Sequence, residues 1–313
     1  MENNNIVSFS PHIKGGESLK RIYLNLSIAL APALLFGFVV YGINAILITL
    51  LCAVSTMGYD IVYNLIKTKK FAITDWSTLF TALAISATMP AGVPCWYPII
   101  GCVVAEFVIK RLSGGNGKYF VNPTAVATIV TLIGFSGALL CYTTPFKHIK
   151  TGESLIAILH NGGLPEGGIM KVLFGLTVGG IGEVAVLFLL VGGIYLCVVK
   201  VIDYKVPAIY LATVLIFSML FFGVEKGFYC IFAGGAVLCA FFLLTDFAVC
   251  PKSLLEKCVY SIIAGIVTVL MWKYAKNYAM GAYYATMIVT VVASATRGLY
   301  RPKITGEIKT NEK

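Results

Sequence analysis

The chain has 313 residues, of which 58% are hydrophobic and only 12% charged, and its formal net charge is +10. An ordinary soluble domain carries about 25% charged residues, so this composition excludes that class, and continuous rather than alternating apolar runs exclude a membrane β-barrel. The basic residues lie in short segments between the apolar runs, where membrane orientation requires them, which argues against nucleic acid as a partner.

The chain begins with a polar segment, residues 1–20, that lacks the apolar core of a signal peptide. Apolar runs then follow at 21–41, 43–66, 77–92, 94–110, 122–140, 179–199, 206–223, 228–245, 258–275 and 279–296. Runs of this length can bury their backbone polar groups in lipid only as helices. The third run is short and ends at Met89-Pro90, which predicts a broken or tilted helix.

We therefore predict an all-α, polytopic membrane protein of about ten transmembrane helices. Its two membrane halves, at 21–140 and 179–298, are joined by a long polar loop at 141–178 and followed by a tail at 299–313. Five spans on each side of one loop suggest an inverted repeat, and the dipeptides Thr74-Asp75 and Thr245-Asp246 are loosely similar.

The distribution of positive charge predicts the orientation. An even number of spans places both termini on one side, and most of the 24 Lys and Arg residues fall on that side. Positively charged loops stay in the cytoplasm, so we expect cytoplasmic termini and an outward-facing loop at 141–178.

Glycine-rich stretches mark two candidate contact regions. Gly115 and Gly117 precede the fifth span, where exposed backbone N–H groups could meet a planar or anionic ligand or could simply form a flexible turn. Asn122 before Pro123 suits a helix cap, and its amide could instead contact a heteroaromatic ring. Gly182 and Glu183 open the sixth span, and both are candidate cofactor contacts. The glycine could instead serve helix packing, and the carboxylate could instead favour a helix N-terminus.

Four further acidic residues lie in or beside the spans. Asp75 and Asp246 are expected at the inner ends of the third and eighth spans, where they are either solvated or part of an ion path. Asp60 and Glu106 are deeper and are either buried polar contacts or ion ligands. The nine cysteines and three histidines show no metal-site, disulfide or haem-ligand spacing, so no catalytic residue and no metal ligand is assigned.

Several of these features occur together in one known family. The following residues occur in the order found there: Ser10-Pro11-His12, Thr81, Gly114-Gly115-x-Gly117, Asn122-Pro123, Thr143-Thr144-Pro145, Gly182-Glu183 and Thr245-Asp246. On these residues the chain resembles the D subunits of Rnf complexes, the ion-translocating ferredoxin:NAD oxidoreductases. It is similar, more distantly, to the B subunits of sodium-pumping NADH:quinone reductases.

The resemblance implies a flavin cofactor. In that family FMN is attached by a phosphoester bond to a threonine of an outer loop, which implies Thr144, the residue next to Pro145. The usual attachment stretch, Ser-Gly-Ala-Thr, reads Cys141-Tyr142-Thr143-Thr144 here. Riboflavin near the inner face is a further implied cofactor, with Asn122 as a contact, although Tyr119 replaces a common asparagine.

The function implied is that of a membrane electron-transfer subunit in a redox-driven Na⁺ or H⁺ pump of a bacterial or archaeal cytoplasmic membrane. Its partners would be other membrane subunits, including a second FMN-bearing one, and soluble subunits that handle ferredoxin and NAD. A membrane core of about 30 Å is too thick for one flavin to bridge. Glu183 and Asp246 would be the first carboxylates to test for coupling. A quinone-reducing complex, a cofactor-free transporter and a structural subunit without flavin stay open as alternatives.

Overall fold

The architecture is that of a computed structural model, which describes residues 19–68, 76–115, 117–135, 137, 141–147, 149–151, 153–165 and 167–296. The α-helices of this part are α1 (Leu19–Tyr41), α2 (Ile43–Thr68), α3 (Trp76–Thr88), α4 (Tyr97–Val103), α5 (Pro123–Gly134), α6 (Leu155–His160), α7 (Gly168–Leu173), α8 (Val186–Val198), α9 (Lys205–Phe222), α10 (Val224–Cys230), α11 (Ala236–Leu238), α12 (Leu254–Tyr274) and α13 (Gly281–Thr296). Two π-helices, η1 (Val104–Arg111) and η3 (Cys239–Leu243), continue α4 and α11, and a short 3-10 helix, η4 (Tyr278–Met280), leads into α13.

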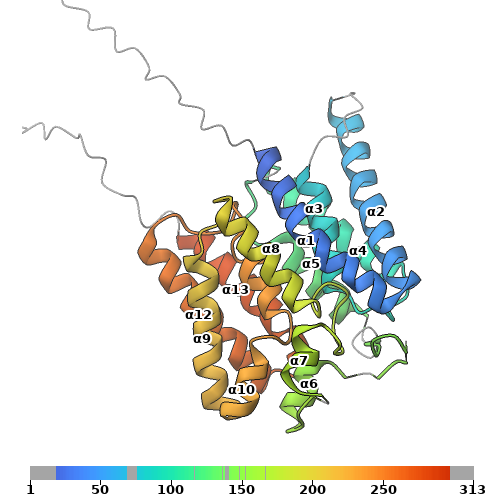
Figure 1. Cartoon of the computed structure of the whole chain (residues 1–313). Helices are drawn as coiled ribbons and strands as arrows, with labels where there is room; N and C mark the ends of the chain where they lie inside the picture. The colour runs from blue at the N-terminus through green and yellow to red at the C-terminus, as the bar shows by residue number, and fades with distance from the viewer. Residues whose placement is uncertain are drawn as a thin grey trace, which may run out of the picture.

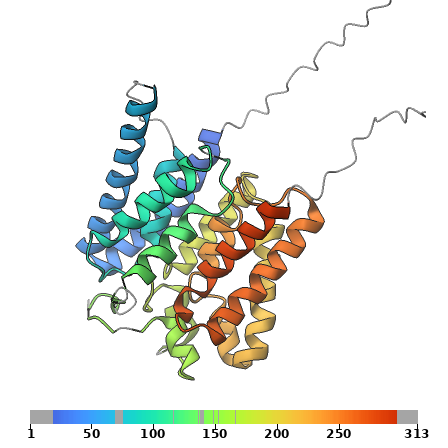
Figure 2. The ribbon, with the colours of Figure 1, turned by 180° about the vertical axis from the view of Figure 1, so that it is seen from behind.

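The helices form one bundle with two distinct ends (Figure 1). The beginning of α1 and the end of α13 lie at one end, which we call the termini end, and α6 and α7 lie at the opposite end, the loop end. Figure 2 shows the same arrangement from behind. The start of α1 and the end of α13 therefore lie on one side, and the helices of the predicted outer loop, α6 and α7, lie on the other.

The spans fall into long and short classes. Five helices in the described residues are long and apolar enough to cross a membrane, namely α1, α2, α9, α12 and the Tyr278–Thr296 segment, whereas α3, α5 and α8 are shorter apolar helices. Large apolar side chains such as Leu35, Ile66 and Leu220 are more than 60% exposed, as lipid contact requires. The polytopic all-α class is thus confirmed.

Several expected spans are shorter than predicted, or are interrupted where one continuous helix was expected. The run at 77–92 is helical only to Thr88, the run at 179–199 becomes helical only at Val186, and the run at 228–245 is interrupted before Ala236. Pro90 cannot donate a helical hydrogen bond, and Gly234 and Gly235 adopt left-handed backbone angles of +56° and +68°. The bundle therefore contains non-helical backbone at depth, which lipid tolerates only where protein surrounds it.

Packing supports the hypothesis of an inverted repeat. In the first half α2 packs on α3 and α4, and in the second half α9 packs on η3 and α12. The two halves meet through like elements, because α1 packs on α8 and α5 packs on α13. α1 runs toward the loop end while α8 runs toward the termini end, so the related elements are antiparallel.

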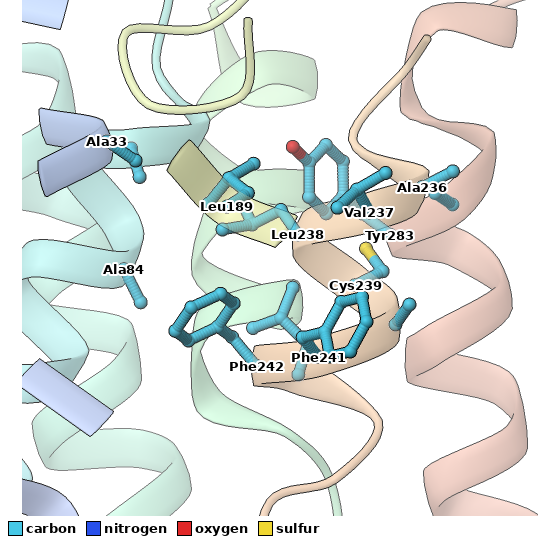
Figure 3. Close-up of a cluster of buried hydrophobic side chains, with 14 of the residues drawn as sticks. Ala33, Ala84, Leu189, Ala236, Val237, Leu238, Cys239, Phe241, Phe242 and Tyr283 are labelled. Atoms are coloured by element: carbon cyan, nitrogen blue, oxygen red, sulfur yellow. The ribbon is translucent and has the colours of Figure 1, made fainter. Parts of the chain in front are cut away.

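The core lies where the two halves meet (Figure 3). Leu189, Val237 and Phe242 are buried together, with Ala33 and Ala84 from the first half facing them. Small residues let the backbones approach closely here, since a Cβ on Gly192 would lie 2.2 Å from the Ala29 carbonyl oxygen.

An ion pair at the termini end offers a pH test of the α8–α9 connection. Lys257 Nζ lies 2.8 Å from Asp203 Oδ2, and this hydrogen bond lowers the pKa of Asp203. A carboxyl whose pKa is lower when folded stabilises the fold above its unfolded pKa of about 3.9, and that contribution is lost as the pH falls through the folded pKa.

We therefore expect Asp203→Asn to reduce the free energy of unfolding by only about 0.2–1 kcal/mol at neutral pH, since the pair is partly solvated. The difference from the wild type should disappear as the pH falls well below about 3.9. Thermal unfolding in detergent at both pH values measures it, and a difference that persists in acid would contradict the assignment.

Candidate functional site

The segment around Thr144 forms a tight hairpin at the loop end. Thr143 and Lys150 form an antiparallel bridge, and the Thr144 amide donates to the Ile149 carbonyl at 2.9 Å. Phe146 at the turn has a φ of +59°, and its amide donates to the carbonyl of Val40 at the end of α1 at 3.1 Å. The hairpin is therefore held by its own backbone and anchored on the bundle.

The adjacent threonines of this hairpin, Thr143 and Thr144, differ in solvent exposure. Thr143 is only 5% exposed, and its hydroxyl has no hydrogen-bond partner among the described residues. Its methyl group lies against Gly92, where a Cβ would approach it to 2.9 Å. Thr144 is partly exposed, and its hydroxyl oxygen accepts from the Ile149 amide at 3.2 Å. Of this adjacent pair, only Thr144 thus presents its hydroxyl to the surface.

The glycine-rich stretch before α8 is hydrogen-bonded through its backbone to the end of α3, and we call this contact the clasp. The amides of Ile181 and Gly182 donate to the carbonyls of Met89 and Ala87, each at 2.9 Å. A Cβ on Gly182 would lie 2.7 Å from the Ala87 Cβ. Gly182 is therefore required by close packing, which is the simpler of its two predicted roles.

Glu183 lies directly after this clasp, further from the membrane-spanning part of α8 than expected. Its Oε2 accepts two hydrogen bonds at 3.3 Å, one from the Gly180 amide and one from the Tyr283 hydroxyl. In Figure 3 the Tyr283 hydroxyl points out of the apolar cluster toward the loop that precedes α8. The carboxylate also interacts electrostatically with Tyr41, Tyr142 and Cys239.

A second polar cluster lies toward the termini end, around Asp246. The Tyr119 hydroxyl donates to both carboxylate oxygens at 2.9 and 2.8 Å, and the Ala248 amide donates at 3.2 Å. The Tyr23 hydroxyl lies 2.9 Å from that of Tyr119. Because Tyr119 donates to the carboxylate, its oxygen is left to accept from Tyr23. Asp246 is only 3% exposed, so it is not simply solvated.

Asn122 belongs to this second cluster. Its Oδ1 accepts from the Ala125 amide at 3.0 Å, which confirms the predicted cap of α5. Its Nδ2 donates to the Leu243 carbonyl at 3.0 Å and to Asp246 Oδ2 at 3.3 Å. Both ends of the amide are engaged, so the residues here do not fit a flavin without rearrangement. The riboflavin contact at Asn122 stays a prediction.

The substitution Tyr119→Phe tests how tightly this cluster is built. It removes the O–H donor from Asp246 and leaves the carboxylate with fewer partners. A hydrogen bond to a charged group contributes about 1.5–3 kcal/mol, so we expect a loss of that order in the free energy of unfolding. Thermal unfolding in detergent measures it.

Tyr210→Phe is the matched control for that variant. The Tyr210 hydroxyl is fully buried and lies 3.0 Å from the neutral Thr268 hydroxyl. Loss of a neutral hydrogen bond costs about 0.5–1.5 kcal/mol. Equal losses in the two variants would contradict a charge-assisted role for Tyr119.

Gly115 and Gly117 lie in the turn after η1, also toward the termini end. Their φ angles are +103° and +81°, and a Cβ on either would meet nothing within 4 Å. The turn conformation therefore explains both glycines, and they do not share a site with Thr144. Their predicted contact with a ligand stays a prediction.

The remaining predicted carboxylates have partners or fall outside the described residues. Asp60 forms an ion pair with Arg111, which also covers the ring of Tyr63. Glu106 pairs with Lys110 at 2.7 Å, and Lys110 also donates to the Ser77 carbonyl at 3.0 Å. Asp60 and Glu106 are thus buried polar contacts. Asp75, predicted for an ion path, lies outside the described residues.

The predicted site residues thus divide between the two ends of the bundle. Thr144, Gly182 and Glu183 belong to the loop end, and Asn122, Gly115, Gly117 and Asp246 belong to the termini end. Sequence reasoning missed Tyr23 and Tyr283, whose hydroxyls complete the two clusters. Neither tyrosine lies in a recognisable motif, so only the fold reveals them.

Comparisons with known proteins cover nearly the whole chain. A family model described as the NQR2, RnfD, RnfE family matches residues 6–306. The D subunit of the Na⁺-translocating ferredoxin:NAD⁺ oxidoreductase complex of Acetobacterium woodii is 30% identical over 321 residues, 98% of this chain and 97% of that protein. The D subunit of the proton-translocating ferredoxin:NAD⁺ oxidoreductase complex of Clostridium ljungdahlii is 27% identical over 306 residues, 91% of each chain. The D subunit of the ion-translocating oxidoreductase complex of Methanosarcina acetivorans is 26% identical over 287 residues, 92% of each.

Proposed function

The chain belongs to the NQR2, RnfD, RnfE family, and on that premise we propose that it is a membrane subunit of an ion-translocating ferredoxin:NAD⁺ oxidoreductase. It would carry FMN as a phosphoester on Thr144 and lie in a bacterial or archaeal cytoplasmic membrane with both termini inside. Its partners would be further membrane subunits, one of them also bearing FMN, and soluble subunits that handle ferredoxin and NAD. The energy of electron transfer would move Na⁺ or H⁺.

The hairpin at the loop end carries this proposal. Of the adjacent threonines Thr143 and Thr144, Thr144 has the partly exposed hydroxyl, on a turn bonded to Ile149 and anchored on Val40. Formation of a phosphoester there replaces only the weak 3.4 Å bond that the hydroxyl donates to the Ile149 carbonyl. Thr144 therefore fits the attachment, whereas the buried Thr143 does not.

Bound FMN would supply the capacity to accept and pass on electrons, and the protein would position and tune it. The hairpin fixes the attachment point relative to α1. The hydrogen bonds from Ile181 and Gly182 to the end of α3 keep Glu183 close to Tyr142, two residues before Thr144. A carboxylate near the attachment loop gives the protein a means to sense charge that arrives there.

The names of the relatives do not indicate which ion this chain would help to move. The two that are named after an ion differ, because the Acetobacterium protein is called Na⁺-translocating and the Clostridium protein proton-translocating. Asp246 is a proposed ion-path residue, but its carboxylate receives donors from Tyr119, Asn122 and Ala248. An Na⁺ ion needs oxygen acceptors, so it would have to displace some of these donors.

The experiment that tests the proposal uses the complex purified with this chain and reconstituted in vesicles. Reduced ferredoxin should drive NAD⁺ reduction together with cation accumulation, and both should be lost when the chain is deleted. Quinone reduction in place of NAD⁺ reduction would favour the alternative of a sodium-pumping NADH:quinone reductase subunit. Unchanged electron transfer without the chain would favour a cofactor-free transporter.

A further inference from the structure

The third and the eighth span, one in each half of the chain, are both interrupted. The third span ends at Thr88, before Met89-Pro90, and the eighth is broken at Gly234-Gly235, before α11 and η3. Paired interruptions of this kind in repeated membrane halves mark sites for small ions, because unwound backbone leaves polar groups free at depth. Both interruptions lie beside one side chain, that of Glu183.

Glycine backbone flanks the Glu183 carboxylate on two sides. On one side, a Cβ on Gly180 would lie 2.8 Å from Glu183 Oε2, 2.9 Å from the Ala87 oxygen and 3.0 Å from the Thr88 oxygen. On the other, a Cβ on Gly235 would lie 2.5 Å from the Tyr283 oxygen and 3.3 Å from Glu183 Oε1. Neither glycine can carry a side chain here, and oxygen atoms converge at both.

The charge around Glu183 is not compensated by any ion pair found in the described part of the chain. Asp60 and Glu106 are paired with Arg111 and Lys110, and Asp246 receives hydrogen bonds onto both of its oxygens. Glu183 receives two bonds, each 3.3 Å long and both on Oε2. The groups that face it, Tyr41, Tyr142, Tyr283 and Cys239, bring no positive charge. A buried carboxylate without a counter-charge is costly.

From this geometry we infer that Glu183, with the Thr88 carbonyl oxygen at the end of α3 and the Tyr283 hydroxyl, is the binding site of a monovalent cation, H⁺ or Na⁺. The inference deepens the proposed function, on which its link to electron transfer rests. Either cation supplies the missing charge. A proton would form an O–H bond on a carboxylate oxygen, whereas Na⁺ would be held by carboxylate and carbonyl oxygens, and nothing is oxidised or reduced.

The position of Glu183 explains how the site could be coupled to electron transfer. Tyr142 faces the carboxylate and lies two residues before Thr144 in the same hairpin. Negative charge that arrives at a group on Thr144 would favour cation binding at Glu183, and its departure would favour release. Coupling requires a differential interaction of this kind between the two states.

Infrared difference spectroscopy on the purified complex tests the site directly. If the cation is H⁺, the C=O band of a protonated carboxyl should titrate with pH and ignore Na⁺. If it is Na⁺, adding Na⁺ at constant pH should abolish that band, while K⁺ should not. In both cases Glu183→Gln should lack the response. The control Glu225→Gln removes an exposed carboxylate of α10 and should keep it.

Identical difference spectra of the wild type and Glu183→Gln at every pH and Na⁺ concentration would contradict a cation site at Glu183. If Glu183→Gln fails to fold, Tyr283→Phe keeps the carboxyl and removes one donor, so it must shift the band, and an unshifted band overturns the site equally. Covalent flavin is measured on the same samples. A titrating band without covalent flavin would support the cation site and contradict the proposed function. Covalent flavin without a titrating band would support the proposed function and contradict the cation site.

Discussion

Replacing Thr144 by valine is expected to reduce ferredoxin-driven NAD⁺ reduction by the assembled complex to background. Valine keeps the β-branched shape but cannot form a phosphoester, so one electron carrier is missing from the path. The hydroxyl makes only two weak hydrogen bonds, both to Ile149, at 3.2 and 3.4 Å. Each contributes at most about 0.5–1.5 kcal/mol, so the chain should still fold and assemble. Turnover of purified complex, normalised to the amount of assembled protein, measures the effect.

Thr143→Val is the matched control for Thr144→Val. It removes a buried hydroxyl that has no partner in the described residues, so it should leave turnover unchanged and not destabilise the fold. Thr144→Ser retains the hydroxyl and should retain part of the turnover. Loss of turnover in Thr143→Val with retention in Thr144→Val would move the attachment to Thr143 and contradict the argument from exposure.

The second large effect concerns the contact between the two halves. Gly192→Ala should destabilise the bundle by about 1–3 kcal/mol or more, because overpacking at a rigid contact forces the backbone to move. The new Cβ would lie 2.2 Å from the carbonyl oxygen of Ala29, where α1 packs on α8. No side-chain rotation can relieve a contact with backbone. Thermal unfolding in detergent and yield of the assembled complex measure the loss.

Gly58→Ala is the control at a position without neighbours. A Cβ on Gly58 meets nothing within 4 Å, and the residue lies inside α2. Alanine should therefore raise stability by roughly 0.5–1 kcal/mol through helix propensity. Equal melting temperatures of the two variants would show that the α1–α8 contact is looser than the structure indicates.

The apolar runs were enough to predict the class of fold, because each must be helical in lipid. They could not predict where helices stop. The amides of Ile181 and Gly182 bond to carbonyls of Met89 and Ala87, far away in the sequence, and no local pattern encodes such a pairing. The glycines indicated a packing or contact role, and the break at Pro90 was predicted because its cause is local.

Contacts within the sites could be predicted from the sequence only where the partners lie close together in the chain. Glu106 and Lys110 are four residues apart, a helical spacing from which their ion pair could have been predicted. The cap by Asn122 followed from the adjacent Pro123. Asp246 meets Tyr119 across 127 residues, and Tyr119 meets Tyr23 across 96, so only the folded chain brings this cluster together. The choice of Thr144 over Thr143 rested on family resemblance and now has a structural reason in exposure.

Peptide mapping of the wild-type chain by mass spectrometry tests the attachment of flavin to Thr144 most directly. Cleavage after Lys118 and Lys147 releases residues 119–147, which contain Thr143 and Thr144. We expect this peptide to carry the mass of one FMN joined with loss of water, and fragment ions to place it on Thr144. An unmodified peptide from an active complex, or a flavin on another residue, would contradict attachment at Thr144.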